Sequence, residues 1–165
     1  MNNRSADLCA WSVGILPAAL TARYHGLRDA MNQPTRILIV ADRADQPGAT
    51  QEALARQDFE IVAASNFNEA YDRLLDSIFE LIVIETTEPA RASFEFIKRV
   101  RAAPQLAGIL ILILAEWGTG APTLALSAGA DAYEPNGPNE GRSISPTRLV
   151  TSIERLLSRQ VAAAN

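Results

Sequence analysis

From residue 36 onward, short apolar runs alternate with segments in which apolar residues recur at helical spacing. The runs occupy residues 37–40, 59–63, 81–85 and 109–114, and a shorter one occupies 131–134. A short run of aliphatic residues with little polar interruption is typical of a parallel strand that is buried on both faces. The pattern therefore predicts five strands.

The segments between these runs predict five helices. The most regular covers residues 66–78, where Asn66 suits the N-cap, Glu69 follows three positions later and Leu75 is one of the expected inward residues. A short helix is expected within residues 42–57. Another is expected at 123–128, ended by Gly129.

Two further helices complete the alternation. The helix after Pro89 is expected to turn Phe94, Ile97 and Val100 inward and to leave its basic residues in water, namely Lys98, Arg99 and Arg101. A last helix opens at Ser145-Pro146. Strands that alternate with helices in this way specify a doubly wound parallel sheet with right-handed crossovers.

Residues 1–34 carry no strand-like run. Leu20, Tyr24, Leu27 and Met31 share one helical face, so this segment is expected to be a partly helical extension. It either packs loosely on the domain or docks a partner, and Met31 is an alternative start of the native protein. We therefore divide the chain into an extension at 1–34, a domain at 35–160 and a tail at 161–165.

Composition excludes several classes of function. The 165 residues carry a net charge of −4 with no basic run, which argues against a nucleic-acid-binding surface. Cys9 and His25 are the only residues of their kinds, so an internal disulfide and a Cys/His metal cluster are excluded. No apolar run reaches the roughly 18 residues of a membrane span. We expect a cytoplasmic protein with no membrane association.

Candidate chemistry lies at the carboxyl ends of the predicted strands, where doubly wound sheets bind their ligands. Ala41 and Asp42 follow the first strand, and Leu114 and Ala115 end the fourth. The third strand, within residues 79–89, ends in the acid Glu85. The functional question is whether Glu85 performs chemistry there.

Residues 36–160 resemble the receiver domain of bacterial two-component response regulators. The run 80–85 resembles the strand that ends in the phosphoacceptor Asp, and Pro89 stands four residues after the acid, as in that family. Gly129-Ala130-Asp131-Ala132-Tyr133 resembles the signature before the last strand. The resemblance implies a flavodoxin-like fold with strand order 2-1-3-4-5, and it places Tyr133 at the family's switch aromatic.

The sequence departs from this family at the positions that carry its chemistry. Receivers transfer a phosphoryl group to Asp with the help of Mg²⁺, a second acid, a hydroxyl and a Lys. Here Glu85 replaces the nucleophile, and its extra methylene moves the carboxylate by about 1.5 Å. The other positions hold Ala41 beside Asp42 for the acidic pair, Leu114 or Ala115 for the hydroxyl, and Asn136 for the Lys.

The resemblance therefore predicts an atypical receiver, or pseudo-receiver, that is not an enzyme and binds no cofactor. It would act in phosphorelay signalling by protein–protein interaction with a histidine kinase, another regulator or a second copy. The expected docking face comprises residues 123–128, 131–134 and 146–160. Candidate contact residues are Trp117, Tyr133, Leu149 and Ile153.

Four alternatives stay open. Glu85 could mimic a phosphorylated Asp, or Glu85 and Asp42 could serve a conventional phosphorylated receiver. The same two acids could hold Mg²⁺ weakly. The fold could instead bind a nucleotide or another small ligand. The breaker-rich loop at 134–144 is either a recognition loop or slack.

Overall fold

The computed structural model covers the alternating part of the chain. Most of the predicted extension lies outside the described residues, as do Asp42, Trp117 and much of the 134–144 loop. The described residues are 34–41, 49–55, 57–86, 91–115, 121–136 and 144–163.

Five parallel strands form one sheet in the order β2-β1-β3-β4-β5, as predicted. The aliphatic runs of the three central strands are buried, at residues 37–40 of β1, 81–84 of β3 and throughout β4, which explains their unbroken sequences. The strands are β1 (Thr35–Ala41), β2 (Phe59–Ala64), β3 (Leu81–Thr86), β4 (Leu110–Ala115) and β5 (Ala132–Pro135).

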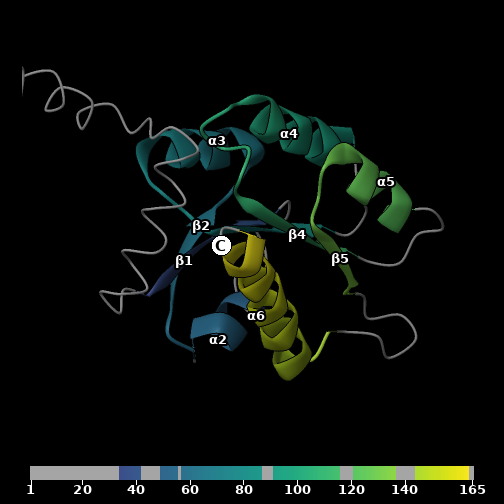
Figure 1. Cartoon of the computed structure of the whole chain (residues 1–165). Helices are drawn as coiled ribbons and strands as arrows, with labels where there is room; N and C mark the ends of the chain where they lie inside the picture. The colour runs from purple at the N-terminus through teal and green to yellow at the C-terminus, as the bar shows by residue number, and fades with distance from the viewer. Residues whose placement is uncertain are drawn as a thin grey trace, which may run out of the picture.

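Five helices of the described chain cover the two faces of the sheet. Figure 1 shows α3, α4 and α5 on one face and α2 and α6 on the other. The last helix extends past the predicted domain boundary at residue 160. The helices are α2 (Ala49–Ala55), α3 (Phe67–Asp76), α4 (Arg91–Ala102), α5 (Ala121–Ala128) and α6 (Pro146–Ala163).

Polar caps fix where two of these helices begin. The Asn66 side-chain oxygen accepts a hydrogen bond from the Glu69 backbone N–H at 2.9 Å, which confirms the predicted cap of α3. The Glu69 carboxylate turns back to accept from Ser65, from both its backbone N–H and its hydroxyl. At α6, the Ser145 hydroxyl oxygen accepts from the Arg148 N–H at 3.3 Å.

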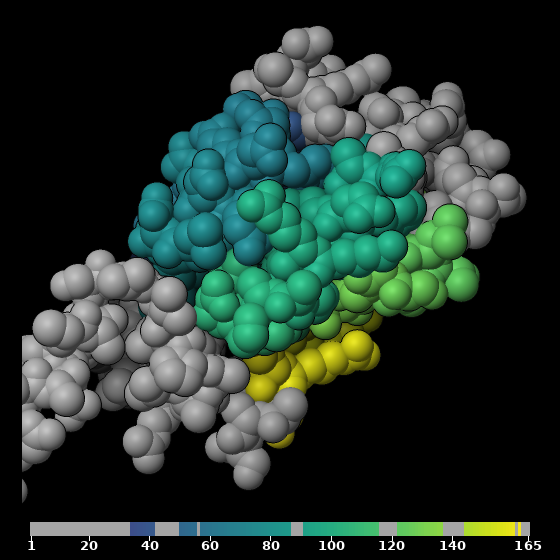
Figure 2. Space-filling model, turned by 90° about the horizontal axis from the view of Figure 1, so that it is seen from above, coloured from purple at the N-terminus to yellow at the C-terminus, as the bar shows by residue number. Residues whose placement is uncertain are grey.

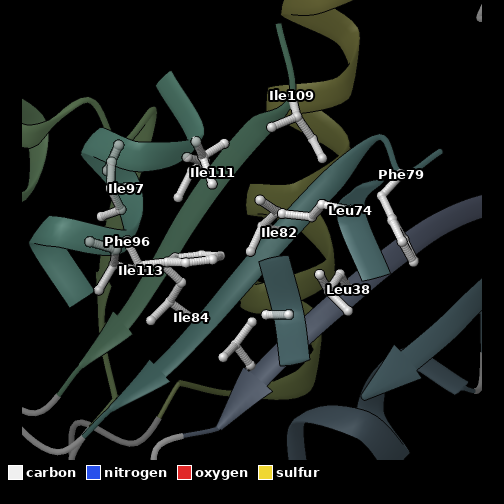
Figure 3. Packing of buried hydrophobic residues seen from close by; sticks show 14 of the residues in the cluster. Leu38, Leu74, Phe79, Ile82, Ile84, Phe96, Ile97, Ile109, Ile111 and Ile113 are labelled. Carbon is white, nitrogen blue, oxygen red and sulfur yellow. The ribbon is translucent and has the colours of Figure 1, made fainter. Parts of the chain in front are cut away.

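Alternate strand residues enter two separate cores. Figure 3 shows the first, where Ile82, Ile84, Ile111 and Ile113 point toward α3 and α4. The second lies against α2 and α6 and includes Leu112. Each fully buried aliphatic side chain stabilises the fold by about 1.5–3 kcal/mol.

Two side chains differ from the expected pattern. Leu75 is 40% exposed, because the inner positions of α3 belong to Ala70 and Leu74. On α4, Phe96 is the buried phenylalanine, whereas Phe94 is only partly buried. The expectation that Leu75 turns inward was therefore wrong, whereas Phe94 packs against the core as expected and Phe96 joins it there.

The expectation that Arg101 lies in water was also wrong. Its guanidinium donates to the backbone oxygens of Gly129 at 2.8 Å and Ile109 at 2.6 Å, and to the Asp131 carboxylate at 2.7 Å. Asp131 also accepts from the Ile111 N–H at 2.7 Å. Arg101 thus ties the end of α4 to the turn between α5 and β5.

We predict that Gly129→Ala destabilises the protein by about 1–3 kcal/mol. Gly129 has a φ of 111°, and an added Cβ would lie 2.9 Å from the Arg101 Cγ. Gly108→Ala is the matched control, because a Cβ there meets nothing within 4 Å. Urea unfolding should show a change within about 0.5 kcal/mol for the control. Equal losses in the two variants would contradict this role of Gly129.

Candidate functional site

A row of four in-register residues crosses the sheet near its carboxyl end. Ala41 pairs with Glu85, Glu85 with Leu114, and Leu114 with Glu134. In-register residues of parallel strands point to the same face, which here is the face covered by α2 and α6. Two carboxylates therefore lie on one face of the sheet, on either side of Leu114.

The Glu85 carboxylate is half-buried and receives two neutral hydrogen bonds. The Thr50 hydroxyl donates to Glu85 Oε1 at 3.1 Å, and the Asn136 side-chain amide reaches the same oxygen at 3.5 Å. Thr50 lies in the first turn of α2 and is only 4% exposed. Sequence reasoning missed Thr50, because no local motif marks it and only the return of α2 over the sheet brings it to Glu85.

No positive charge among the described residues pairs with Glu85. Burial consequently raises the pKa of its carboxyl above the ordinary value of 4.5, and the Thr50 hydrogen bond offsets part of that rise.

Asn136, at the position of the family's Lys, links three segments. Its backbone N–H donates to the Ala115 oxygen at 2.8 Å, which joins it to the end of β4. Its side-chain oxygen accepts from the Ile144 N–H at 3.3 Å, while its amide faces Glu85. Asn136 therefore fastens both ends of the 134–144 loop to the site without supplying a charge.

The remaining candidate positions are apolar. Ala41 is partly buried, and Leu114 and Ala115 are both 0% exposed. Leu114 belongs to the core beneath α2 and α6, and Ala115 to the opposite core. Whichever of these two residues is aligned with the hydroxyl position of the family, its side chain is packed in a core and has no hydroxyl group.

Glu134, which sequence reasoning did not single out, has the charged partner that Glu85 lacks. Its Oε2 accepts from the Arg148 guanidinium at 2.9 Å, and its Oε1 accepts from the Ser152 hydroxyl at 2.7 Å. Both donors lie on α6, one helical turn apart. The Arg148 guanidinium therefore joins α6 to β5 at this end of the sheet.

Known structures share this fold. The chain is similar to the chemotaxis response regulator CheY4 of Vibrio cholerae, with 22% identity and a TM-score of 0.63 over 74% of this chain and 98% of that one. A CheY-like receiver domain protein of Methanospirillum hungatei gives 22% identity and a TM-score of 0.65 over 79% and 98%. The chain folds as a response-regulator receiver domain.

A curated relative points the same way. The chain is 24% identical over 140 residues to response regulator Rre1 of Synechocystis, a match that covers 82% of this chain. The chain spans 57% of the length of that relative. No family model matches the sequence.

The structure also locates the proposed contact residues of the receiver. Tyr133 is half-buried, packs against the core beneath α3 to α5, and has a pKa raised by burial. Leu149 and Ile153 are 1% and 0% exposed, because they face the sheet. Their prediction as a partner surface was therefore wrong. Trp117 lies outside the described residues.

Among the described residues, no three His, Cys, Asp or Glu side chains lie close enough together to hold a metal ion. The weak Mg²⁺ site of Asp42 and Glu85 includes an undescribed residue and stays a hypothesis. No helix in the described part is both long and apolar enough to cross a bilayer.

We predict that Glu85→Gln stabilises the receiver more near pH 7 than near pH 4. The raised pKa means that the folded state holds the Glu85 proton more tightly than the unfolded chain does. The stability that this group contributes is complete below pH 4.5 and is lost as the pH rises through the folded-state pKa. Urea unfolding of both proteins at the two pH values measures the difference.

Glu69→Gln provides a control of opposite sign. Hydrogen bonds from Ser65, and then Arg73, lower the pKa of Glu69 to about 2. The contribution of Glu69 to the stability of the fold is therefore present above pH 4.5 and is lost as the pH falls toward 2. The raised pKa of Glu85 would be contradicted if the stability change caused by Glu85→Gln did not depend on pH, or if it depended on pH in the same direction as that of Glu69→Gln.

Proposed function

We propose that this receiver acts in two-component signalling by binding a protein partner, without accepting a phosphoryl group on Glu85. One observation carries the proposal. Among the described residues, the Glu85 carboxylate is held by the neutral donors Thr50 and Asn136 alone. A site that transfers phosphoryl groups needs positive charge where negative charge accumulates.

The surrounding positions support this interpretation. A phosphoryl group on Glu85 would face the amide of Asn136 at the position where the family has an ammonium. At the position where the family has a hydroxyl, the candidates Leu114 and Ala115 are both buried and apolar, and Ala115 belongs to the opposite core. The same deficits argue against Glu85 as a mimic of a phosphorylated Asp, because the groups that sense the phosphoryl oxygens are replaced. We therefore propose a pseudo-receiver.

The helix α5 offers a surface for the partner. Its inward face contributes Ala125 to the core, whereas Leu124 and Leu126 are 58% and 51% exposed. The helix contains no charged residue. Two large apolar side chains on a short uncharged helix suit a protein contact better than a solvated surface.

This surface belongs to the face that the family resemblance implies for docking, built here from α5, β5 and α6. We propose Leu124 and Leu126 as its apolar contacts, in place of Leu149 and Ile153. The partner is a histidine kinase, another regulator or a second copy of this chain. A role in the cytoplasm follows from this proposal.

The absence of phosphorylation can be tested directly. We predict that incubation with Mg²⁺ and a small phosphodonor leaves the mass of the protein unchanged, because no cation of the described residues binds Glu85 to offset the transferred charge. A conventional receiver treated alongside shows that the donor is active. An adduct on the native chain that is missing from the Glu85→Gln variant would overturn the proposal.

The docking surface has its own test. We expect Leu124→Ser with Leu126→Ser to change the free energy of unfolding by less than about 1 kcal/mol, because both side chains are exposed. The double variant should nevertheless weaken any complex with itself or a histidine kinase at least tenfold, as measured by sedimentation velocity. Leu75→Ser, which removes an exposed leucine from α3, is the matched control. Equal effects of the control and the double variant would refute this surface.

A further inference from the structure

A cleft of about 400 Å³ lies between the N-terminal halves of α3 and α4. Figure 2 looks onto this helical layer, where the blue-teal surface of α3 adjoins the green-teal surface of α4. The α3 side contributes the turn at Asn66 to Asn68, and the α4 side contributes Ala92, Glu95 and Arg99. The volume falls within the roughly 300–1,000 Å³ of small-molecule sites.

The floor of the cleft is aromatic. The rings of Phe67 and Phe96 stack with their centroids 5.1 Å apart and their planes at 29°. Phe96 is 4% exposed and so forms a fixed base, whereas Phe67 is only half-buried and leaves apolar surface open to the cleft. This floor suits the apolar side chain of a ligand.

Two opposite charges border the cleft one helical turn apart on α4. Glu95 and Arg99 are both exposed, and neither forms an ion pair within the described residues. The Arg99 guanidinium lies 3.6 Å from the centre of the Tyr71 ring, a cation–π contact that fixes its plane. The edges of the guanidinium stay free to donate to a carboxylate.

We propose that this cleft binds a small apolar zwitterion, of the class of α-amino acids with an aromatic or aliphatic side chain. Arg99 receives the carboxylate, Glu95 receives the ammonium, and the side chain lies on Phe67 and Phe96. Charge complementarity selects this class, because a ligand with one charge satisfies only one of the two side chains.

The proposal goes beyond the proposed function and does not depend on it. The first turns of α3 and α4 follow the carboxyl ends of β2 and β3, so the ligand would lie near the Glu85 end of the sheet, on the opposite face. A ligand bound there supplies an input signal that requires no phosphoryl transfer.

The test is an NMR titration of the ¹⁵N-labelled full chain with L-phenylalanine. We expect saturable shifts of the backbone amides of Asn68, Glu95 and Arg99. The single-charge analogues 3-phenylpropionate and phenethylamine should bind at least about tenfold more weakly, because each loses one charged hydrogen bond. No saturable shifts at these amides, or equal binding of either analogue, would overturn the proposal.

Matched variants assign the binding to the cleft. Arg99→Ala should weaken phenylalanine binding at least about tenfold, whereas Lys98→Ala, which removes an exposed charge outside the cleft, should leave it unchanged. Ala92→Trp should block the cleft, and Ala102→Trp at the far end of α4 serves as its control. Equal losses within either pair would refute the site. The amide spectrum of each variant shows that it is folded.

Discussion

Burial of the central strands on both faces confines charged side chains to the two ends of the sheet. At the amino end, the Glu80 carboxylate accepts from the Arg36 N–H at 2.6 Å, and Arg101 binds the Asp131 carboxylate. At the carboxyl end, Glu134 is paired with Arg148. Each of these acids ties neighbouring elements together, because a partly buried carboxylate is stable only when its oxygens are satisfied.

Glu85 obeys the same constraint in a different way. It lies on the same face as Glu134, with Leu114 between them, yet its donors are a hydroxyl and an amide. Neutral donors satisfy the oxygen without offsetting its charge, and burial therefore raises the pKa of the carboxyl. The end of β3 is thus a structural junction with α2 and with the segment after β5.

Local patterns of the sequence were sufficient for the fold. Aliphatic runs marked each central strand, Asn66 and Ser145 marked helix starts, and Gly129 marked a helix end at a positive φ. The hydrogen bonds of the Glu85 site could not be predicted in this way, because they join residues that lie far apart in the sequence. Thr50 and Asn136 lie 35 and 51 positions from Glu85, and no periodicity encodes such pairs.

Contacts between residues that are distant in the sequence also explain why some side chains were wrongly predicted to be exposed or buried. Arg101 looked solvated from its helical spacing, but its partners Gly129 and Asp131 come from a later turn of the chain. Leu149 and Ile153 were predicted to contact a partner, but the sheet covers these two side chains instead. Among the described residues, the two most exposed large apolar side chains are Leu124 and Leu126, on a helix too short and too uniform for its faces to be assigned by pattern.

We infer that neutral hydrogen bonds, rather than the charged groups of a phosphoacceptor site, hold the Glu85 carboxylate. This can be tested by a ¹³C NMR titration of the Glu85 side-chain carboxyl, with and without saturating Mg²⁺. We expect a pKa above 4.5 that Mg²⁺ leaves unchanged. A pKa below 4.5, or one that Mg²⁺ lowers, would show that a cation serves this carboxylate and would contradict this inference.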